Sequence, residues 1–284
     1  MQLGDLEIHF ISDGLVSVDA GGPFGLVPRA LFSASHPPDA QNRIPMALHC
    51  LLIRGSGRTI LIDTGIGTKL TPKLISHWGL ERPQGDLIAG LAALGIAPED
   101  VDIVINSHLH GDHCGGNTRL IEGNPSPTFP QAGYWVQRID WADACHPDAR
   151  TRSTYDPRNF EPLMRTGQLK LLHGDTQVMD GVRCVVTPGH TSGHQCVVLE
   201  SQGQSALFVA DMATYATQMA RTAWVTAYDA HPLETIATKK RWQRWVLERN
   251  ALLLLQHDPK TLIGRLRQAS GRYEIETVLE VNAA

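Results

Sequence analysis

The stretch that decides the fold of this sequence spans residues 107–116 and reads Ser107-His108-Leu109-His110-Gly111-Asp112-His113-Cys114-Gly115-Gly116. Three histidines and an aspartate fall within six positions, shortly after the largely apolar run 101–105. A buried strand that ends in imidazole and carboxylate groups builds a poor core, but it suits a metal site at the end of a sheet. His and Asp are ligands for zinc and its neighbours in the first transition row.

The spacing within this stretch favours two metal ions. His108 and His110 are two residues apart, so their side chains point the same way in an extended segment. Asp112 and His113 follow Gly111, which can adopt backbone angles that other residues avoid. One loop could therefore present two ligands to one ion and two to a second. The alternative is a polar loop that is merely rich in histidine, and the density of ligand-type residues argues against it.

The composition is that of an ordinary globular protein. The chain has 284 residues, of which 42% are hydrophobic and 19% charged, and its net charge is −4. No run of Lys and Arg stands out, so we expect neither a nucleic acid nor a membrane as a partner. The five cysteines include no CxxC pair, which indicates no disulfide framework. With no signal peptide and no long apolar run recognised, a cytoplasmic protein is expected.

Other apolar runs end in the same kinds of residue. The run 182–187 leads into a turn that contains His190, the run 206–210 ends at Asp211, and the run 252–255 leads to His257. Together with His108, four strands therefore finish in a residue able to bind a metal. A chance distribution would scatter such residues through helices and turns.

A few local patterns predict the surrounding elements. Alternating apolar residues in 6–10, followed by Asp13-Gly14 and then residues 15–18, predict a hairpin. The stretch 20–45 is rich in Gly and Pro and reads as a long loop, either a plain connection or a wall of a substrate pocket. Residues 232–249 have the pattern of a helix.

Taken together, these residues resemble the metallo-β-lactamase superfamily. Its signature is HxHxDH followed later by a His, an Asp and a His, each at a strand end. The resemblance covers nearly the whole chain, from the first predicted hairpin to Asp258. It implies an α/β fold, a four-layer αββα sandwich of two mixed sheets with helices outside. We expect one such domain over residues 1–284.

The resemblance also implies a dinuclear metal site. One ion would bind His108, His110 and His190, and the other would bind Asp112, His113 and His257, with Asp211 bridging both. Two divalent ions are expected, Zn²⁺ first, although Fe, Mn and Co accept the same ligands. Metal coordination lowers the pKa of water from 15.7 to about 7. A bridging hydroxide would then attack the substrate carbonyl, with Asp112 as a candidate proton shuttle.

Three stretches, 189–195, 210–212 and 224–229, look most like the N-acyl-homoserine lactonases that quench quorum sensing. The expected function is therefore opening of a lactone or another small ester, and a homodimer is a possible assembly because relatives often pair. A missing bridging Asp or a Cys ligand would indicate a true β-lactamase, and a Glu at position 110 would indicate a flavodiiron protein. Neither occurs here. The alternatives on the same site are a phosphotriesterase, a glyoxalase-II-like thioesterase and a mono-iron persulfide dioxygenase. A non-enzymatic protein of this fold would usually have lost ligands.

Several residues outside the ligand set are expected to have roles in the site. Known lactonases carry a substrate-contacting Tyr three residues after the bridging Asp, where this chain has Thr214, so the adjacent Tyr215 is the candidate catalytic tyrosine. His194 and Asp63 are expected to orient ligands, and Cys114 to be structural. Aromatic and other large residues near the ligands could line an apolar cleft or belong to the core: Phe24, Trp78, Tyr215, Met219, Trp224 and His231.

Overall fold

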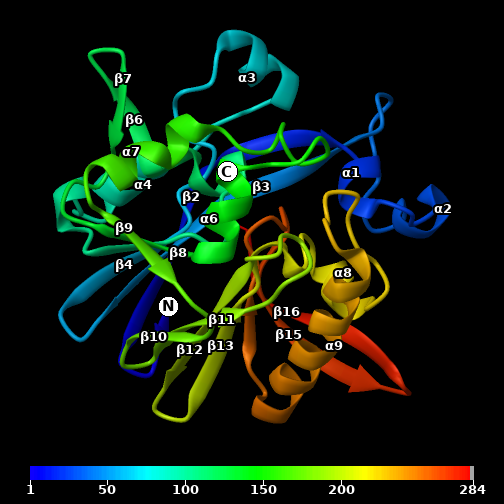
Figure 1. Cartoon of the computed structure of the whole chain (residues 1–284). Helices are drawn as coiled ribbons and strands as arrows, with labels where there is room; N and C mark the ends of the chain where they lie inside the picture. The colour runs from blue at the N-terminus through cyan, green and yellow to red at the C-terminus, as the bar shows by residue number, and fades with distance from the viewer. Residues whose placement is uncertain (282–284) are drawn as a thin grey trace.

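Two seven-stranded sheets form the centre of the molecule, in a computed structural model that describes residues 1–281 (Figure 1). The first sheet has the order β1 (Gln2–Leu3), β2 (Leu6–Asp19), β3 (Arg43–Gly55), β4 (Arg58–Ile62), β5 (Ile103–Ile105), β8 (Gly133–Gln137) and β9 (Leu169–Leu172). The second has the order β10 (Thr176–Met179), β11 (Val182–Val186), β12 (Gln195–Ser201), β13 (Gln204–Phe208), β14 (Leu252–Leu254), β15 (Thr261–Ala269) and β16 (Arg272–Glu280). A small hairpin pairs β6 (Thr118–Ile121) with β7 (Asn124–Pro127).

Both sheets are mixed, as the family resemblance implies. Strands β4, β5, β8 and β9 run parallel, and so do β13 and β14, while the other neighbours are antiparallel. Parallel neighbours need a crossover connection. Helix α4 (Leu87–Ala93) lies in the crossover from β4 to β5, and α9 (Pro232–Arg249) lies in the crossover from β13 to β14. These connections carry helices to the outer faces of the sheets.

The packing produces four layers. The inner core holds buried residues of both sheets, among them Leu51 and Phe208. On the outer face of the first sheet, Leu91 of α4 belongs to a second buried cluster. On the outer face of the second sheet, Trp242 and Val246 of α9 pack into a third. The αββα sandwich is therefore confirmed, and so is the helix predicted over 232–249. None of the helices in residues 1–281 has the length and apolarity that crossing a membrane requires.

Shorter helices cap the edges and connections. They are α1 (Gly21–Phe24), α2 (Arg29–Phe32), α3 (Pro72–Trp78), α5 (Gly111–Cys114), α6 (Arg138–Cys145), α7 (Glu161–Arg165) and α8 (Ala216–Ala220), with 3₁₀ turns at η1 (Pro98–Asp100), η2 (Gly115–Asn117), η3 (Pro157–Asn159) and η4 (Ala210–Met212). The predicted long loop over 20–45 thus contains α1 and α2 and the start of β3.

The predicted hairpin over residues 6–18 is wrong, because β2 runs unbroken from Leu6 to Asp19. Asp13 and Gly14 form a bulge, where the register against β3 shifts between Ser12 and Leu15. The buried Asp13 carboxylate explains the bulge. It accepts hydrogen bonds from the backbone of Gly67 (2.9 Å) and of Leu87 (3.1 Å), and so anchors two connections to the strand.

The strand ends converge as predicted. His108 follows β5, His190 follows β11, Asp211 lies in η4 directly after β13, and His257 follows β14. These strands belong to both sheets, so the site lies along one edge of the sandwich, where the two sheets meet.

Candidate metal centre

The loop after β5 is held by its backbone, which leaves the histidine side chains free to converge. Ser107 N donates to Asp63 Oδ1 at 2.7 Å, and Leu109 N donates to Asp140 Oδ2 at 2.7 Å. Gln195 N of the second sheet donates to Ser107 O at 2.9 Å. The loop is thus tied to three other segments.

The structure brings together all seven residues that the sequence singles out as ligands: His108, His110, Asp112, His113, His190, Asp211 and His257. Three sets of their donor atoms each lie within 4.8 Å of one another. The first set is His108, His110 and His190; the second is Asp112, His113 and His257; the third joins His108 and His113 to Asp211. Two adjoining three-residue sites therefore share one carboxylate.

Asp211 lies between the two sites. Its Oδ2 is 3.1 Å from His190 Nε2 and 3.4 Å from His113 Nε2, and its Oδ1 is 3.0 Å from His257 Nε2. Burial opposes ionisation, but the charges of His257, His113 and His190 hold the pKa of Asp211 well below its usual range. The carboxylate is therefore available as an anion at neutral pH.

The donor set fits divalent metal ions. His108 Nε2 is buried and makes no hydrogen bond with any of residues 1–281. Two pairs of imidazole nitrogens face each other at 3.1 Å: His190 Nε2 with His110 Nδ1, and His257 Nε2 with His113 Nε2. Burial lowers the pKa of His108 and of His110 well below the ordinary value, which favours the neutral imidazole that binds metals. Imidazole nitrogens with carboxylate oxygens suit zinc and similar ions.

A buried carboxylate orients one ligand of the second set. Asp63 Oδ2 lies 2.9 Å from His113 Nδ1 and accepts a hydrogen bond from Ser107 Oγ at 2.7 Å. Although burial opposes protonation, the carboxylates of Asp211 and Asp112 raise the pKa of His113 well above its usual value. Asp63 therefore lies where it can orient a candidate ligand, as expected from the sequence.

A second carboxylate orients His190 in the first set. Asp229 Oδ1 lies 2.9 Å from His190 Nδ1 and accepts a hydrogen bond from Thr226 Oγ1 at 2.8 Å. Asp229 is 1% exposed. Each set thus contains one imidazole whose outer nitrogen is held by a buried Asp, an arrangement that fixes ring orientation and tautomer.

His194 and Cys114 support the site from behind. His194 Nε2 accepts a hydrogen bond from the backbone N of Asp211 at 3.2 Å, and Nδ1 bonds to Thr187 Oγ1 at 2.7 Å. Burial lowers the pKa of His194 to about 3, so the ring is neutral. The Cys114 thiol donates to Leu109 O at 3.2 Å and is absent from the three donor sets of residues 1–281.

The structure does not bring Tyr215 to the substrate side. Its side chain is fully buried against Phe24, and its hydroxyl donates to Pro45 O at 3.0 Å. Phe24 and Met219 are likewise fully buried in core clusters. Of the six residues expected to line a cleft, Trp78 alone lies on the cavity wall described next.

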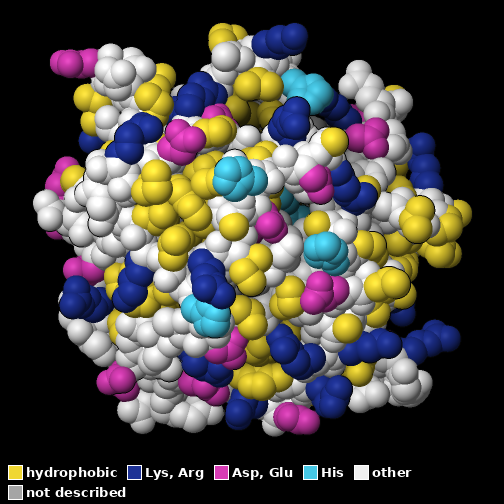
Figure 2. Space-filling view, in the orientation of Figure 1, with side chains coloured by type: hydrophobic (Ala, Val, Ile, Leu, Met, Phe, Trp, Pro, Cys, Tyr) yellow, Lys and Arg dark blue, Asp and Glu magenta, His cyan; other side chains and the backbone are white. Residues whose placement is uncertain are grey.

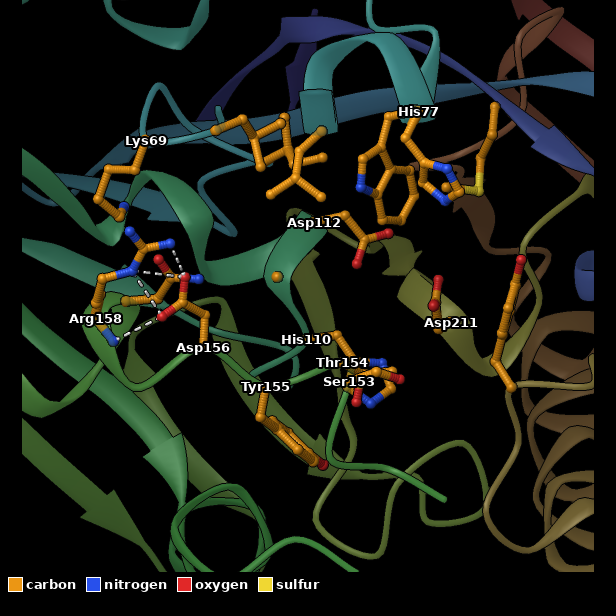
Figure 3. A pocket seen from close by; sticks show the side chains of 18 of the residues that line it. Lys69, His77, His110, Asp112, Ser153, Thr154, Tyr155, Asp156, Arg158 and Asp211 are labelled. Atoms are coloured by element: carbon orange, nitrogen blue, oxygen red, sulfur yellow. Dashed lines mark hydrogen bonds and ion pairs between the residues drawn. The ribbon is translucent and has the colours of Figure 1, made fainter. Parts of the chain in front are cut away.

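A cavity of about 440 Å³ opens over the ligands (Figures 2 and 3). His110, Asp112, His190 and Asp211 contribute to one end of its lining, and two tyrosines, Tyr155 and Tyr228, line the same cavity. In Figure 3, Asp112 and Asp211 lie near His110 and Tyr155, whereas Lys69, Asp156 and Arg158 gather at another end. The lining also includes several apolar side chains: Met46, Ile66, Leu70, Leu74 and Trp78.

Sequence reasoning misses several contributors. Asp140 lies in α6 and has no motif of its own, yet its carboxylate accepts from Leu109 N and from Thr191 Oγ1 (2.6 Å). Burial raises the pKa of Asp140 to about 7. Tyr228 and Asp229 end a stretch that resembles the lactonases, and that resemblance is the signal that could have pointed to them. Lys69, which also lines the cavity, lies in no stretch that resembles the lactonases, so the sequence did not point to it.

Comparison with known proteins agrees with this geometry. The model of the metallo-beta-lactamase superfamily matches residues 44–263. An N-acyl homoserine lactonase of a Bacillus species is 28% identical over 185 residues, which are 61% of this chain and 66% of that protein. The N-acyl homoserine lactonase AttM of Rhizobium radiobacter is 26% identical over 221 residues, 73% of this chain and 80% of its own.

Solved structures show the same fold. A probable metal-dependent hydrolase from Staphylococcus aureus superposes with a TM-score of 0.88 at 29% sequence identity. The match covers 98% of this chain and 100% of the Staphylococcus aureus chain. AidC, a dizinc quorum-quenching lactonase, has a TM-score of 0.80 at 20% identity, covering 99% and 97%. At 20% identity, the likeness to AidC shows a shared fold and nothing more. With the family model matched over more than half of its length, this chain belongs to the metallo-beta-lactamase superfamily and is a metal-dependent hydrolase.

Proposed function

We propose that this hydrolase is a dinuclear enzyme that opens lactones, with N-acyl-homoserine lactones as the first substrate class. The observation that carries the proposal is the position of Asp211 between two complete sets of metal-binding side chains. The named relatives, which are N-acyl homoserine lactonases, support the substrate class.

The donor atoms define which residues would hold the ions. His108, His110 and His190 would hold one, Asp112, His113 and His257 the other, and Asp211 both. Zn²⁺ is the first candidate, given these nitrogen and oxygen donors. Two such ions would supply an activated water at neutral pH and positive charge beside the carbonyl and leaving oxygens.

Asp112 would act as the proton shuttle of the reaction. This side chain is half-buried, lines the cavity, and lies 3.7 Å from His113 Nε2 through its Oδ2. It is therefore the carboxylate of the second set that also reaches the substrate space. We assign it the role of accepting a proton from the attacking water and passing it to the leaving alkoxide. Asp211, held as an anion, would position both ions.

Tyr228, rather than Tyr215, is our candidate for the hydroxyl that contacts the substrate. It lines the cavity together with Asp112 and Asp211, and its backbone N donates to Thr226 Oγ1 at 3.1 Å in the turn that positions Asp229. Although the residue is 40% exposed, desolvation of its hydroxyl, with the nearby carboxylates of Asp112 and Asp211, raises its pKa above the ordinary value. The hydroxyl therefore keeps its proton and can donate a hydrogen bond to a carbonyl or alkoxide oxygen.

Metal analysis beside a substrate panel tests the proposal. Purified protein is analysed for bound elements and assayed with short- and long-chain homoserine lactones, an aryl ester, an aryl phosphotriester and a glutathione thioester. We expect about two metal ions per chain and lactone turnover that D211A abolishes, because that change removes the carboxylate shared by both sets. One iron per chain without lactone turnover would contradict the proposal and direct the next assay to oxygen uptake with a persulfide.

A further inference from the structure

The end of the cavity away from the ligand side chains is cationic. Lys69, Asp156 and Arg158 line it and lie together in Figure 3, apart from Asp112 and Asp211. Two of these three side chains are positively charged and one is negative. This end therefore carries an excess of one positive charge.

Lys69 is an unusual cation because it is only 8% exposed. Its Nζ donates to the backbone oxygens of Gly115 and Thr118, the latter at 2.6 Å. Within residues 1–281, no carboxylate lies within ion-pair distance of this ammonium. Two carbonyls use two of its three protons, which leaves one donor for another ligand. Burying a charge without an opposite charge is costly. Burial lowers the pKa of Lys69 to about 8, so the ammonium form still predominates at pH 7.

Arg158 is already paired, but it retains free donors. Its Nη2 lies 2.7 Å from Asp156 Oδ2, and its Nε contacts both oxygens of that carboxylate at 3.0 Å. Its Nη1 has no hydrogen-bond partner among residues 1–281. The carboxamide of Asn159, which lines the same end and is 4% exposed, also bonds to none of those residues. Asp156 is thus paired with Arg158, and among residues 1–281 Lys69 has no carboxylate of its own within ion-pair distance.

Apolar side chains make up much of the remaining lining of the cavity. Ile66 and Leu70 come from the segment before α3, and Leu74 and Trp78 from α3 itself. A hydrocarbon chain could run along this wall from the ligand side chains to the cationic end. The cavity therefore combines candidate metal-binding side chains at one end, a cation with free donors at the other, and apolar lining besides.

We propose that Lys69, Arg158 and Asn159 form a subsite for a carboxylate at the far end of the substrate. On this basis the substrates are lactones or esters whose acyl chain ends in a carboxylate rather than a methyl group. One carboxylate charge matches the one unbalanced positive charge, and the three side chains offer the donors that its two oxygens accept. The substrate class in this inference rests on the proposed lactonase function. The anion-binding subsite itself does not depend on that function.

Matched substrate pairs test the subsite. N-succinyl, N-adipoyl and N-suberoyl homoserine lactones are compared with the N-butanoyl, N-hexanoyl and N-octanoyl compounds, which have the same chain lengths and end in a methyl group. At the best length we expect kcat/KM to favour the carboxylate by roughly tenfold or more, the effect of a charged hydrogen bond. The ratio should fall to about one in K69M and in R158M.

Suitable controls separate the subsite from general effects. K73M removes an exposed lysine of α3 that does not line the cavity, and should keep the wild-type ratio. If K69M unfolds because its loop contacts are lost, R158M carries the test, since the Arg158 side chain is 50% exposed. A wild-type ratio near one at every length would overturn the subsite. So would a preference for the carboxylate that persists in both variants.

Direct binding distinguishes failure of the subsite from failure of the proposed reaction. Calorimetry on the metal-loaded protein compares adipate with hexanoate, and the ring-opened N-adipoyl product with the N-hexanoyl product. Preferential binding of the carboxylate-ended compounds, lost in K69M or R158M, would support the subsite even if no lactone is turned over. Turnover of both lactones with equal binding of each pair would retain the lactonase and reject the subsite.

Discussion

Asp63 and His113 form a fully buried pair in which Asp63 Oδ2 lies 2.9 Å from His113 Nδ1. The same carboxylate holds Ser107 through its backbone N and its hydroxyl. Asp63 adopts a left-handed backbone angle of 56°, a conformation that Asp tolerates better than most residues. One side chain at the end of β4 therefore controls both the path of the histidine loop and the orientation of one ligand.

The first prediction is that D63N weakens metal binding at the second set. Asn can occupy the same space and the same backbone angle, but it carries no charge to stabilise His113 as a ligand. We expect metal affinity to fall roughly 10- to 100-fold, the range for changes in groups that hold ligands. Competition with a chromogenic chelator measures it. D102N, in a half-exposed residue near the start of β5, should bind metal as the wild type does.

The second prediction concerns D229N and the first set. Asp229 holds His190, whereas Asp63 holds His113, so the two variants should weaken different ions. A stepwise calorimetric titration of metal-free protein should show the loss on one binding step in D229N and on the other in D63N, again roughly 10- to 100-fold. Equal losses on both steps in both variants would contradict the assignment of separate sets.

Four of the candidate ligands were predictable from local sequence, whereas the full set of seven and its division between two ions came from the family resemblance. Each of these four follows an apolar strand, and the ends of such strands meet at one edge of the sandwich. His108, His190, Asp211 and His257 are therefore identifiable without knowing which strands pair. Hydrophobic periodicity, which reports burial, also predicts α9, whereas the two mixed sheets are what the family resemblance implies.

The contacts that support those ligands were harder to predict because they join segments remote in sequence. Asp140 reaches Leu109 across 31 positions, and nothing in α6 marks it. The bulge at Asp13 shows the same limit, since an Asp-Gly pair also predicts a turn, and the contacts that explain its burial come from Gly67, Leu87 and Arg82, all remote in sequence. Tyr215 lies one position after the place where lactonases carry their tyrosine. Its position in the sequence did not reveal that its hydroxyl donates a hydrogen bond to the backbone oxygen of Pro45.

The third prediction separates the two tyrosines. Y228F should lower kcat for lactones by roughly tenfold or more with metal content unchanged, because one hydrogen bond to a charged oxygen is lost. Y215F should keep kcat but lose about 1 kcal/mol of unfolding free energy, since its buried hydroxyl donates to Pro45 O. Steady-state kinetics and urea unfolding measure both. The reverse outcome would return the catalytic role to Tyr215.

The fourth prediction uses Gly22, which leaves room for Tyr228. A Cβ atom on Gly22 would overlap the hydroxyl and the ring carbon that carries it. G22A should therefore displace the tyrosine and reduce kcat about as much as Y228F does. In a Y228A background the same change should have little further effect, because the clash is gone. Additive losses in the double variant would show that Gly22 acts through another contact.

The last prediction is a pH dependence of stability that arises from Lys239. This lysine of α9 is fully buried and donates to the backbone oxygens of Arg221 (3.2 Å) and Trp224 (2.8 Å). Burial lowers its pKa to about 7, although the charge of Asp229 acts in the opposite direction. In the unfolded chain a lysine has a pKa near 10.4.

Between pH 7 and 10 the unfolded chain therefore binds a proton that the folded chain has released. Linkage then requires the contribution of Lys239 to the free energy of unfolding to rise with pH, by up to about 1.4 kcal/mol per pH unit. Denaturant unfolding of wild type and K239M at pH 7, 8 and 9 measures it. The difference between the two proteins should grow in favour of the wild type as pH rises, whereas K240M, in the exposed neighbouring residue, should parallel the wild type. A constant difference across this range would mean that Lys239 stays protonated in the fold.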